Sequence, residues 1–442
     1  MRRTVPALLA LTLGLMSCMQ APTPQSGVSS IPATPAPAAV TQPAVTDPAA
    51  AQTTPPAESA PVEGTPADGG QTESAQALRR PSLVPDTYGQ AVSVQNATLR
   101  VGNQSLFPFG FYHVSWMSDA ATRQRDMQEM SAAGFNTMTA SVINDADNAR
   151  YGEFLDAAAR ARMYVLSEGV FESSIPKLAT KPAVLGWMVA DDCNLQYTPA
   201  QVRARGARMR ALDPLHPTYA ALFTSYAESH SEFFDTTHMM GNMSYPIGPG
   251  DSIGATYDMQ RLSVALSKKN GTVPVANLQS FSWGTVPGHD AADPAARMPT
   301  PAEVYNMTYQ AIGAGVRGIL YYTYLDSYSN VRRSPAVWDM TRSIVPEIAQ
   351  LSPMLLSAEP QYLETNNGNV HATAWAYQGH TYLLLTNISA TQAQPLYVPL
   401  AAQRPTGLQP LFAGRGGEGV KLGGTTLGGT IAPLGAHFFR IN

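Results

Sequence analysis

The chain has 442 residues, of which 44% are hydrophobic and 14% are charged, enough for one large globular domain and a smaller one. With 28 Lys and Arg against 32 Asp and Glu, the net charge of −4 supplies no basic field for a phosphate backbone, which argues against nucleic-acid binding. Of the two cysteines, Cys18 lies in the N-terminal segment described next, so Cys193 is left as a lone thiol without a disulfide partner in the mature chain.

The N-terminus has the pattern of an export signal. Met1-Arg2-Arg3 is followed by an apolar stretch from Pro6 to Met16 that is too short to span a bilayer as a helix. Leu15-Met16-Ser17-Cys18 resembles the bacterial lipobox, which implies a signal peptide over residues 1–17 and lipid attachment at Cys18. A plain signal peptide with an incidental cysteine is the alternative. We expect an exported protein, lipid-anchored to a bacterial cell-envelope membrane.

Residues 18–84 are rich in Pro, Ala and Thr. Large apolar side chains are nearly absent, as in Ile31-Pro32-Ala33-Thr34-Pro35-Ala36-Pro37. Such a stretch cannot bury enough surface to offset the entropy lost on ordering. We therefore expect a disordered tether between the anchor and the folded part.

From residue 85 to 357, helical and strand patterns alternate. After a small hairpin at 91–94 and 97–101, strands are expected at 106–112, 137–140, 163–167, 184–189, 217–222, 236–243, 273–279 and 318–322. Helices are expected at 120–133, 146–162, 198–212, 253–269, 300–312 and 334–351. Capping boxes that begin at Thr198 and Thr300 mark two of the helix starts. Eight strands in this rhythm, over roughly 250 residues, predict an α/β fold of the (β/α)8 TIM-barrel type.

The pattern changes at residue 358. Alternating strands are expected at 370–377, 381–387, 396–400 and 436–441, with glycine-rich turns between the last two. Residues 358–442 are therefore expected to form a small antiparallel β-sandwich domain.

Two adjacent acids follow the fourth expected barrel strand. The run Val184–Val189 reads as a fully buried strand, and the two acids Asp191 and Asp192 follow it before a helix start at Thr198. In a (β/α)8 barrel, chemistry is presented at the carboxyl ends of the strands. Like charge and partial burial raise the pKa of one acid of such a pair. The alternative is that both acids cap the following loop or pair with arginines.

The region from Asn96 onward resembles the retaining glycoside hydrolases built on (β/α)8 barrels with a C-terminal β-sandwich. The matching segments are Leu106–Tyr112, Ala133–Thr137, Leu185–Asp192, Tyr245-Pro246 and Gly318–Tyr322. In these relatives strand four ends in Asn or Asp followed by Glu, the general acid/base, so Asp192 matches the acid and Asp191 its neighbour. The resemblance implies hydrolysis of a β-linked oligo- or polysaccharide without a cofactor.

The sequence departs from that family in two places. Asp192 is one methylene shorter than the usual Glu, and Gln279 stands where the nucleophilic Glu of strand seven is expected. Catalysis then requires a second carboxylate from elsewhere at the same face. The candidates are Glu168 after strand three and Asp326 after strand eight, with Glu172 and Asp145 as weaker options.

Residues that follow the strands form a second candidate set, for binding sugar rings. Aromatic faces stack on sugars and polar tips bond hydroxyl groups. The candidates are Tyr112, His113, Trp116, Tyr245, Gln279, Trp283 and Tyr324, beside Phe281. We expect about half of the aromatic residues to face the cleft and the others to pack loops.

The histidines show no metal-ligand spacing, so no metal is expected. Two other functions stay open: a catalytically silent barrel that binds glycan, favoured by Gln279, and a structural envelope spacer, suggested by the long tether. The expected partners are a carbohydrate and, through Cys18, a membrane. Oligomeric state is open.

Overall fold

The computed structural model describes residues 82–114, 118–141, 145–223, 227–248, 250–400 and 405–442. The expected signal peptide, Cys18, Trp116 and all but the end of the tether lie outside these residues. Within the described ranges, every helix is too short or too polar to cross a bilayer.

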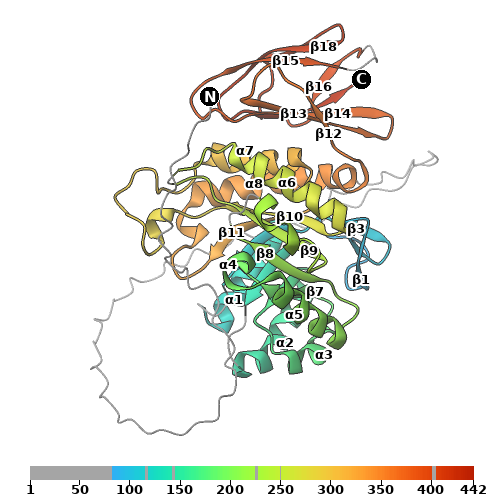
Figure 1. The fold of residues 1–442 in the computed structure, drawn as a ribbon, viewed down its shortest axis with the longest axis vertical. Helices are drawn as coiled ribbons and strands as arrows, with labels where there is room; N and C mark the ends of the chain where they lie inside the picture. The colour runs from blue at the N-terminus through green and yellow to red at the C-terminus, as the bar shows by residue number, and fades with distance from the viewer. Residues whose placement is uncertain (1–81, 115–117, 142–144, 224–226, 249, 401–404) are drawn as a thin grey trace, which may run out of the picture. The chain divides into compact units, whose positions relative to one another are not determined.

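Eight parallel strands close into a barrel in the order β10-β11-β4-β5-β6-β7-β8-β9, which confirms the predicted fold class (Figure 1). The strands are β4 (Phe109–His113), β5 (Thr137–Ser141), β6 (Tyr164–Glu168), β7 (Val184–Ala190), β8 (Thr218–Leu222), β9 (Met239–Ser244), β10 (Val273–Gln279) and β11 (Ile319–Leu325). The helices around them are α1 (Ala120–Ala132), α2 (Asp145–Arg160), α3 (Ile175–Leu178), α4 (Cys193–Gln196), α5 (Pro199–Leu212), α6 (Ala255–Asn270), α7 (Pro301–Ala314) and α8 (Pro335–Ser357).

The strands are buried on both faces, which is why they read as nearly continuous apolar runs. On β4 the side chains alternate between two cores. Phe109 and Phe111 pack outward in the core between barrel and helices. Tyr112 points inward and packs with residues such as Tyr219 in the core of the barrel interior.

A three-stranded sheet precedes the barrel, where the sequence predicts only a hairpin. It consists of β1 (Val92–Gln95), β2 (Thr98–Val101) and β3 (Gln104–Leu106). The expected strand 106–112 is divided, because Pro108 has no N–H to continue a ladder. Leu99 and Leu106 pack with the interior residues of the barrel strands, so this sheet covers the amino end of the barrel.

Asn136 ties the start of the barrel together and carries a testable prediction. Its Oδ1 accepts the N–H of Phe109 at 2.8 Å, and its Nδ2 donates to Phe107 O at 2.9 Å and Leu83 O at 3.0 Å. Asn136→Ala leaves three buried backbone groups unpaired, so we expect a loss of about 2–4 kcal/mol of unfolding free energy in urea titrations. The exposed Asn270→Ala is the matched control, with a change below about 0.5 kcal/mol. Equal losses in the two variants would contradict this role of Asn136.

The C-terminal region forms two antiparallel sheets, which confirms a β domain after the barrel. One has the order β12-β13-β14-β19-β16 and the other β15-β18-β17. Their strands are β12 (Gln361–Leu363), β13 (Val370–Tyr377), β14 (His380–Asn387), β15 (Gln394–Pro399), β16 (Leu408–Pro410), β17 (Val420–Gly423), β18 (Thr426–Ile431) and β19 (Ala436–Ile441). The stretch predicted as glycine-rich turns thus contains three further strands, β16, β17 and β18. Leu383, Val398 and Leu427 belong to the core shared by the two sheets.

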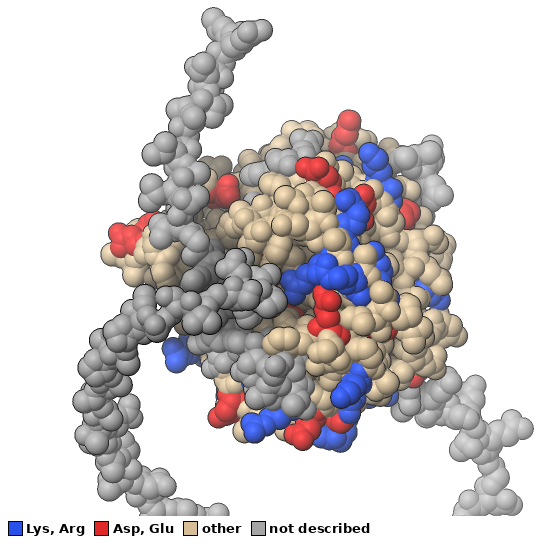
Figure 2. All heavy atoms as spheres, turned by 60° about the horizontal axis from the view of Figure 1, so that its bottom comes forward, with Lys and Arg blue, Asp and Glu red and all other residues tan. Residues whose placement is uncertain are grey.

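The surface charge is mixed. On the face in Figure 2, Lys and Arg side chains are interspersed with Asp and Glu over an uncharged surface. Charges of both signs in such proximity partly cancel at the distances over which a nucleic acid is attracted.

Candidate active site

Three carboxylates meet at the carboxyl ends of two neighbouring barrel strands. Strand β6 ends at Glu168, and Asp191 and Asp192 directly follow β7, which pairs with β6 in parallel. Glu168 and Asp191 are each 9% exposed and Asp192 is 5% exposed. The fourth residue predicted to be catalytic, Asp326, lies near the same group, since its charge and that of Asp191 both act on the phenols of Tyr245 and Tyr322.

Asp192 is held in an unusual backbone conformation. It has φ 43° and ψ 40°, in the left-handed region, and it precedes α4 without making a side-chain cap bond. Its carboxylate makes no hydrogen bond or ion pair with any residue that the structure describes. Asp tolerates this region better than most residues, yet the conformation costs on the order of 1 kcal/mol and is typical of functional positions. The carboxylate is therefore not used to cap the following helix.

The surroundings of Asp192 favour its protonated form. Burial, and secondly the negative charge of Glu168, raise the pKa of Asp192 to about 7. An ordinary aspartate has a pKa near 3.9. At neutral pH this carboxyl group therefore exists in comparable amounts as acid and as anion, which is the state that a general acid requires.

Asp191 is surrounded by buried tyrosines. Burial raises the pKa of the phenols of Tyr112, Tyr219, Tyr245 and Tyr322, and the negative charge of Asp191 raises it further in each case. These four side chains come from β4, β8, the segment after β9, and β11. The Asp191 carboxylate thus lies among four uncharged tyrosine side chains at the carboxyl end of the barrel interior.

Below Asp191, a triad of polar side chains fills the barrel. Tyr112 Oη and Tyr219 Oη lie 2.7 Å apart. Asn277 Nδ2 donates to Tyr112 Oη at 3.0 Å, and Tyr219 Oη donates to Asn277 Oδ1 at 3.0 Å. Tyr112, predicted to bind substrate, therefore has its hydroxyl group engaged in this triad. Tyr219 and Asn277 were not predicted, although their inward position follows from alternation along β8 and β10.

An aromatic group stands beside the acids. Tyr245 contacts Phe281 edge-on, with ring centroids 5.2 Å apart, and Trp283 packs against both rings. Trp283 Nε1 donates to Tyr245 O at 3.2 Å, which fixes the loop after β9. The hydroxyl group of Tyr245 is buried and has no hydrogen-bond partner among the described residues. The negative charges of Asp191 and Asp192 act on this phenol, so it lies close to the acids.

Gln279 is fully buried and its amide is completely engaged. Oε1 accepts the N–H of Ile247 at 2.8 Å, while Nε2 donates to Ile247 O at 2.8 Å and Phe281 O at 3.1 Å. Gln279 therefore joins the segments that follow β9 and β10. Where the sequence resemblance places a nucleophile, the structure has a connecting residue.

Asp326 also has local partners. Its Oδ1 accepts the N–H groups of Tyr328 at 2.7 Å and Ser329 at 2.5 Å, and Tyr322 hydrogen-bonds its side chain. Burial raises the pKa of Asp326, against the lowering effect of these bonds. The carboxylate stabilises the turn after β11. This leaves Glu168 as the carboxylate that acts most directly on Asp192.

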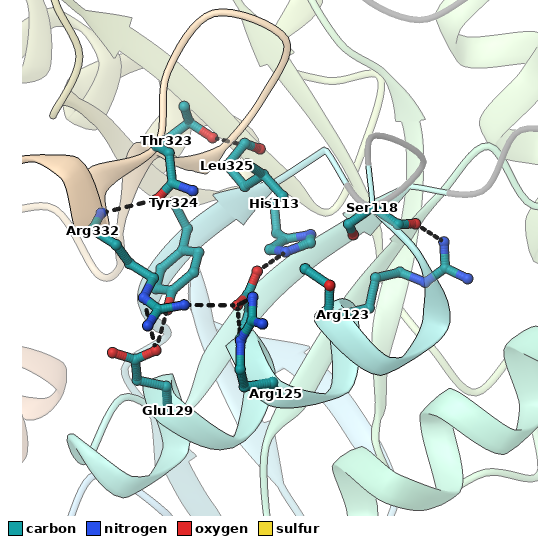
Figure 3. A network of polar contacts seen from close by, with 12 residues as sticks. His113, Ser118, Arg123, Arg125, Glu129, Thr323, Tyr324, Leu325 and Arg332 are labelled. Carbon is teal, nitrogen blue, oxygen red and sulfur yellow. Dashed lines mark hydrogen bonds and ion pairs between the residues drawn. The ribbon is translucent and has the colours of Figure 1, made fainter. Parts of the chain in front are cut away.

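Two of the predicted sugar-binding residues lie on the helical side of the barrel wall (Figure 3). His113 is 1% exposed, and its Nε2 lies 3.2 Å from Asp126 Oδ2 on α1. Tyr324 Oη donates to Glu129 Oε2 at 2.9 Å, and Arg332 Nε pairs with the same oxygen at 3.2 Å. These contacts join β4 and β11 to α1, on the other side of the barrel wall from Glu168, Asp191 and Asp192.

Of the weaker options, Glu172 pairs with Arg208 at 3.0 Å, and the side chain of Asp145 lies outside the described residues, as does Trp116. Within the described ranges, no group of three His, Cys, Asp or Glu could hold a metal ion.

No protein-family model matches the sequence, and no curated protein matches it as a sequence relative. Solved structures match the fold. A glycoside hydrolase family 5 protein from Bacteroides vulgatus aligns with a TM-score of 0.56 at 14% identity, over 80% of this chain and 93% of that one. The GH27 β-L-arabinopyranosidase from Geobacillus stearothermophilus aligns at 0.54 and 11%, over 76% and 96%. An α-amylase from Geobacillus thermoleovorans, complexed with acarbose, aligns at 0.51 and 9%, over 79% and 99%. At such identities the likeness shows the fold, which this chain shares with glycoside hydrolases of several families.

Proposed function

We propose that this protein is a glycoside hydrolase in which Asp192 is the general acid and Glu168 its carboxylate partner. The observation that carries the proposal is the Asp192 carboxyl group itself: buried, unbonded to the described residues, and with its pKa raised to about 7 by burial and by Glu168. Cleavage of a glycoside requires one protonated and one ionised carboxyl group on either side of the scissile bond. The fold shared with several glycoside hydrolase families supports this reading.

In the proposed reaction, Asp192 donates its proton to the glycosidic oxygen as the bond from that oxygen to the anomeric carbon breaks. Glu168 either takes a proton from an attacking water or attacks the anomeric carbon itself, followed by hydrolysis of the ester. Asp191 orients the four tyrosine hydroxyl groups around the site or accepts a hydrogen bond from a sugar hydroxyl group. The aromatic group of Tyr245, Phe281 and Trp283 supplies apolar faces for a sugar ring, and the unpaired Tyr245 hydroxyl supplies a hydrogen bond. By resemblance, the substrate class is a β-linked oligo- or polysaccharide.

A catalytically silent glycan-binding barrel is the second candidate. Gln279 favours it, since its side-chain amide is not a nucleophile and is hydrogen-bonded to the backbone of Ile247 and Phe281. The two candidates differ in a measurable way, because a binding protein retains its glycan unchanged.

The test is reducing-sugar release from a panel of β-linked glycans by the full chain, with calorimetric binding measured on the same panel. Hydrolysis of at least one glycan, with the configuration of the first product read by NMR, would support the proposal and decide between water and Glu168 as the attacking group. Tight binding without release over days would support the silent barrel instead.

We also propose export and lipid anchoring through Cys18, on the sequence pattern alone. The expected result is that the wild-type protein, expressed in a bacterium, incorporates labelled palmitate and sediments with membranes. Cys18→Ala should abolish both the label and the sedimentation, since a single site would carry the lipid. Cys193→Ala is the control and should keep both. Unchanged sedimentation of Cys18→Ala would rule out this anchor.

A further inference from the structure

A second feature of the carboxyl end of the barrel is a pocket between α1 and α2. It is a small hollow of about 100 Å³ that opens to solvent, room for a single charged group. Arg123 and Gln124 of α1 line one side, and Arg150 and Phe154 of α2 line the other. Ser141, the last residue of β5, lies at its base.

This pocket adjoins the proposed catalytic pair. Ser141 is the register partner of Glu168 across β5 and β6. The hydroxyl group of Tyr151, which also lines the pocket, donates to Ala140 O at 3.0 Å and is hydrogen-bonded to Ser167 Oγ at 3.2 Å, one residue before Glu168. The charges of Glu168 and Arg123 both act on the Tyr151 phenol, so both groups lie in its neighbourhood. Tyr151 therefore links the pocket lining to the end of β6, which carries Glu168.

The charge of the pocket is opposite to that of the site next to it. Arg123 is partly buried, and its Nη1 donates to Ser118 O at 3.0 Å, which holds the guanidinium in place (Figure 3). Arg150 is exposed and makes no hydrogen bond or ion pair with the described residues. Among the lining residues that the structure describes, Glu153 is the one acid, so arginines outnumber acids there by two to one.

From this arrangement we propose that the pocket binds an anionic group, a carboxylate or a sulfate ester, carried by the sugar next to the scissile bond. Guanidinium groups bind both anions through paired hydrogen bonds. Glu168, Asp191 and Asp192 repel an anionic sugar. The arginines offset that repulsion only for an anionic group that lies in the pocket, so they select sugars that carry their charge at that position. Tyr151 and Phe154, stacked with centroids 5.6 Å apart, give the sugar ring an apolar wall. The inference rests on the proposed function for the location of the substrate.

The test measures binding and hydrolysis separately. Three β-linked oligosaccharides are used: one containing glucuronic acid, its carboxyl-reduced neutral counterpart, and a sulfated counterpart. Binding is measured by calorimetry with full-length Asp192→Asn, so that turnover does not interfere. Into this background we place Arg123→Gln with Arg150→Gln, and separately Arg150→Gln alone, since that side chain is exposed and its loss leaves the fold intact. The matched control is Arg160→Gln with Arg205→Gln, which removes the same charge outside the pocket.

We expect the double pocket variant to bind an anionic oligosaccharide about tenfold more weakly or worse, and Arg150→Gln to show part of that loss. Binding of the neutral sugar and the control variant should change by less than about twofold. The uronate and sulfate arms show which anion the pocket takes. Equal affinities in the pocket variants and the control would overturn the inference, as would an equal loss for the neutral sugar. Wild-type hydrolysis of the same three sugars tests the proposed function independently, since arginine-dependent binding without release would leave the pocket standing and reject the hydrolase.

Discussion

Asp192→Asn is expected to reduce the rate of glycan hydrolysis by about 10²–10⁴-fold, the usual contribution of a positioned general acid. The asparagine keeps the shape of the side chain but has no proton to give to the leaving oxygen. The loss should appear in kcat, with KM changed little, because the proton moves in the transition state. Substrates with good leaving groups, such as nitrophenyl glycosides, should lose less activity, since their departure needs less protonation.

Glu168→Gln should cause a loss of the same order. In the residual activity, the alkaline limb of the pH–rate profile, where the general acid loses its proton, should shift to lower pH. The reason is that removing the charge of Glu168 removes one of the two causes that raise the pKa of Asp192. Asp235→Asn serves as the control, because this exposed carboxylate pairs with Arg203 on the surface. Full activity in Asp192→Asn would remove this residue from the mechanism, whatever the effect of Glu168.

The same substitution, Asp192→Asn, should stabilise the folded protein at alkaline pH. The pKa of Asp192 is about 7 in the folded chain, against about 3.9 unfolded, so between these values the folded state binds more protons than the unfolded state. Stability therefore falls as pH rises from about 4 to about 7, and the cost is fully present above pH 7. The neutral asparagine avoids this cost, which reaches at most about 4 kcal/mol for three pKa units.

The measurement is the unfolding free energy of wild type and Asp192→Asn in urea at pH 4, 6 and 8. The difference should be near zero at pH 4 and should grow in favour of the variant toward pH 8. Asp235→Asn should show a small difference that does not grow in that direction. A constant difference across the range would mean that Asp192 titrates as an ordinary carboxylate. A gain in stability together with a loss of activity is typical of a residue kept for function.

Much of the fold could be predicted from local patterns. The expected strand 273–279 has the same bounds as β10. Both capping boxes form, at Thr198 with Gln201 and at Thr300 with Glu303. These features depend on neighbours in the chain, so they can be read without the tertiary structure. The closing helix was predicted to end at 351 but continues to Ser357, since Met354 and Leu355 are buried in the core.

The candidate site was harder to predict. His113 and Tyr324 lie at the carboxyl ends of their strands, where side chains that face the substrate are expected. Their side chains nevertheless point to α1. Tyr322, which the sequence analysis passed over, faces Asp191 and Asp326 instead. The choice between inward and outward positions depends on how each strand enters the closed barrel, and a shift by one residue exchanges the two faces.

The sequence alone determined the rhythm of strands and helices and the two acids after β7, because burial periodicity and caps act over a few residues. Only the tertiary structure decided that the charge of Glu168 acts on Asp192, that Gln279 connects two loops, and that Arg123 and Arg150 share one pocket. Those relations join residues distant in the chain. They depend on barrel closure and strand order, which place the ends of β5, β6 and β7 side by side.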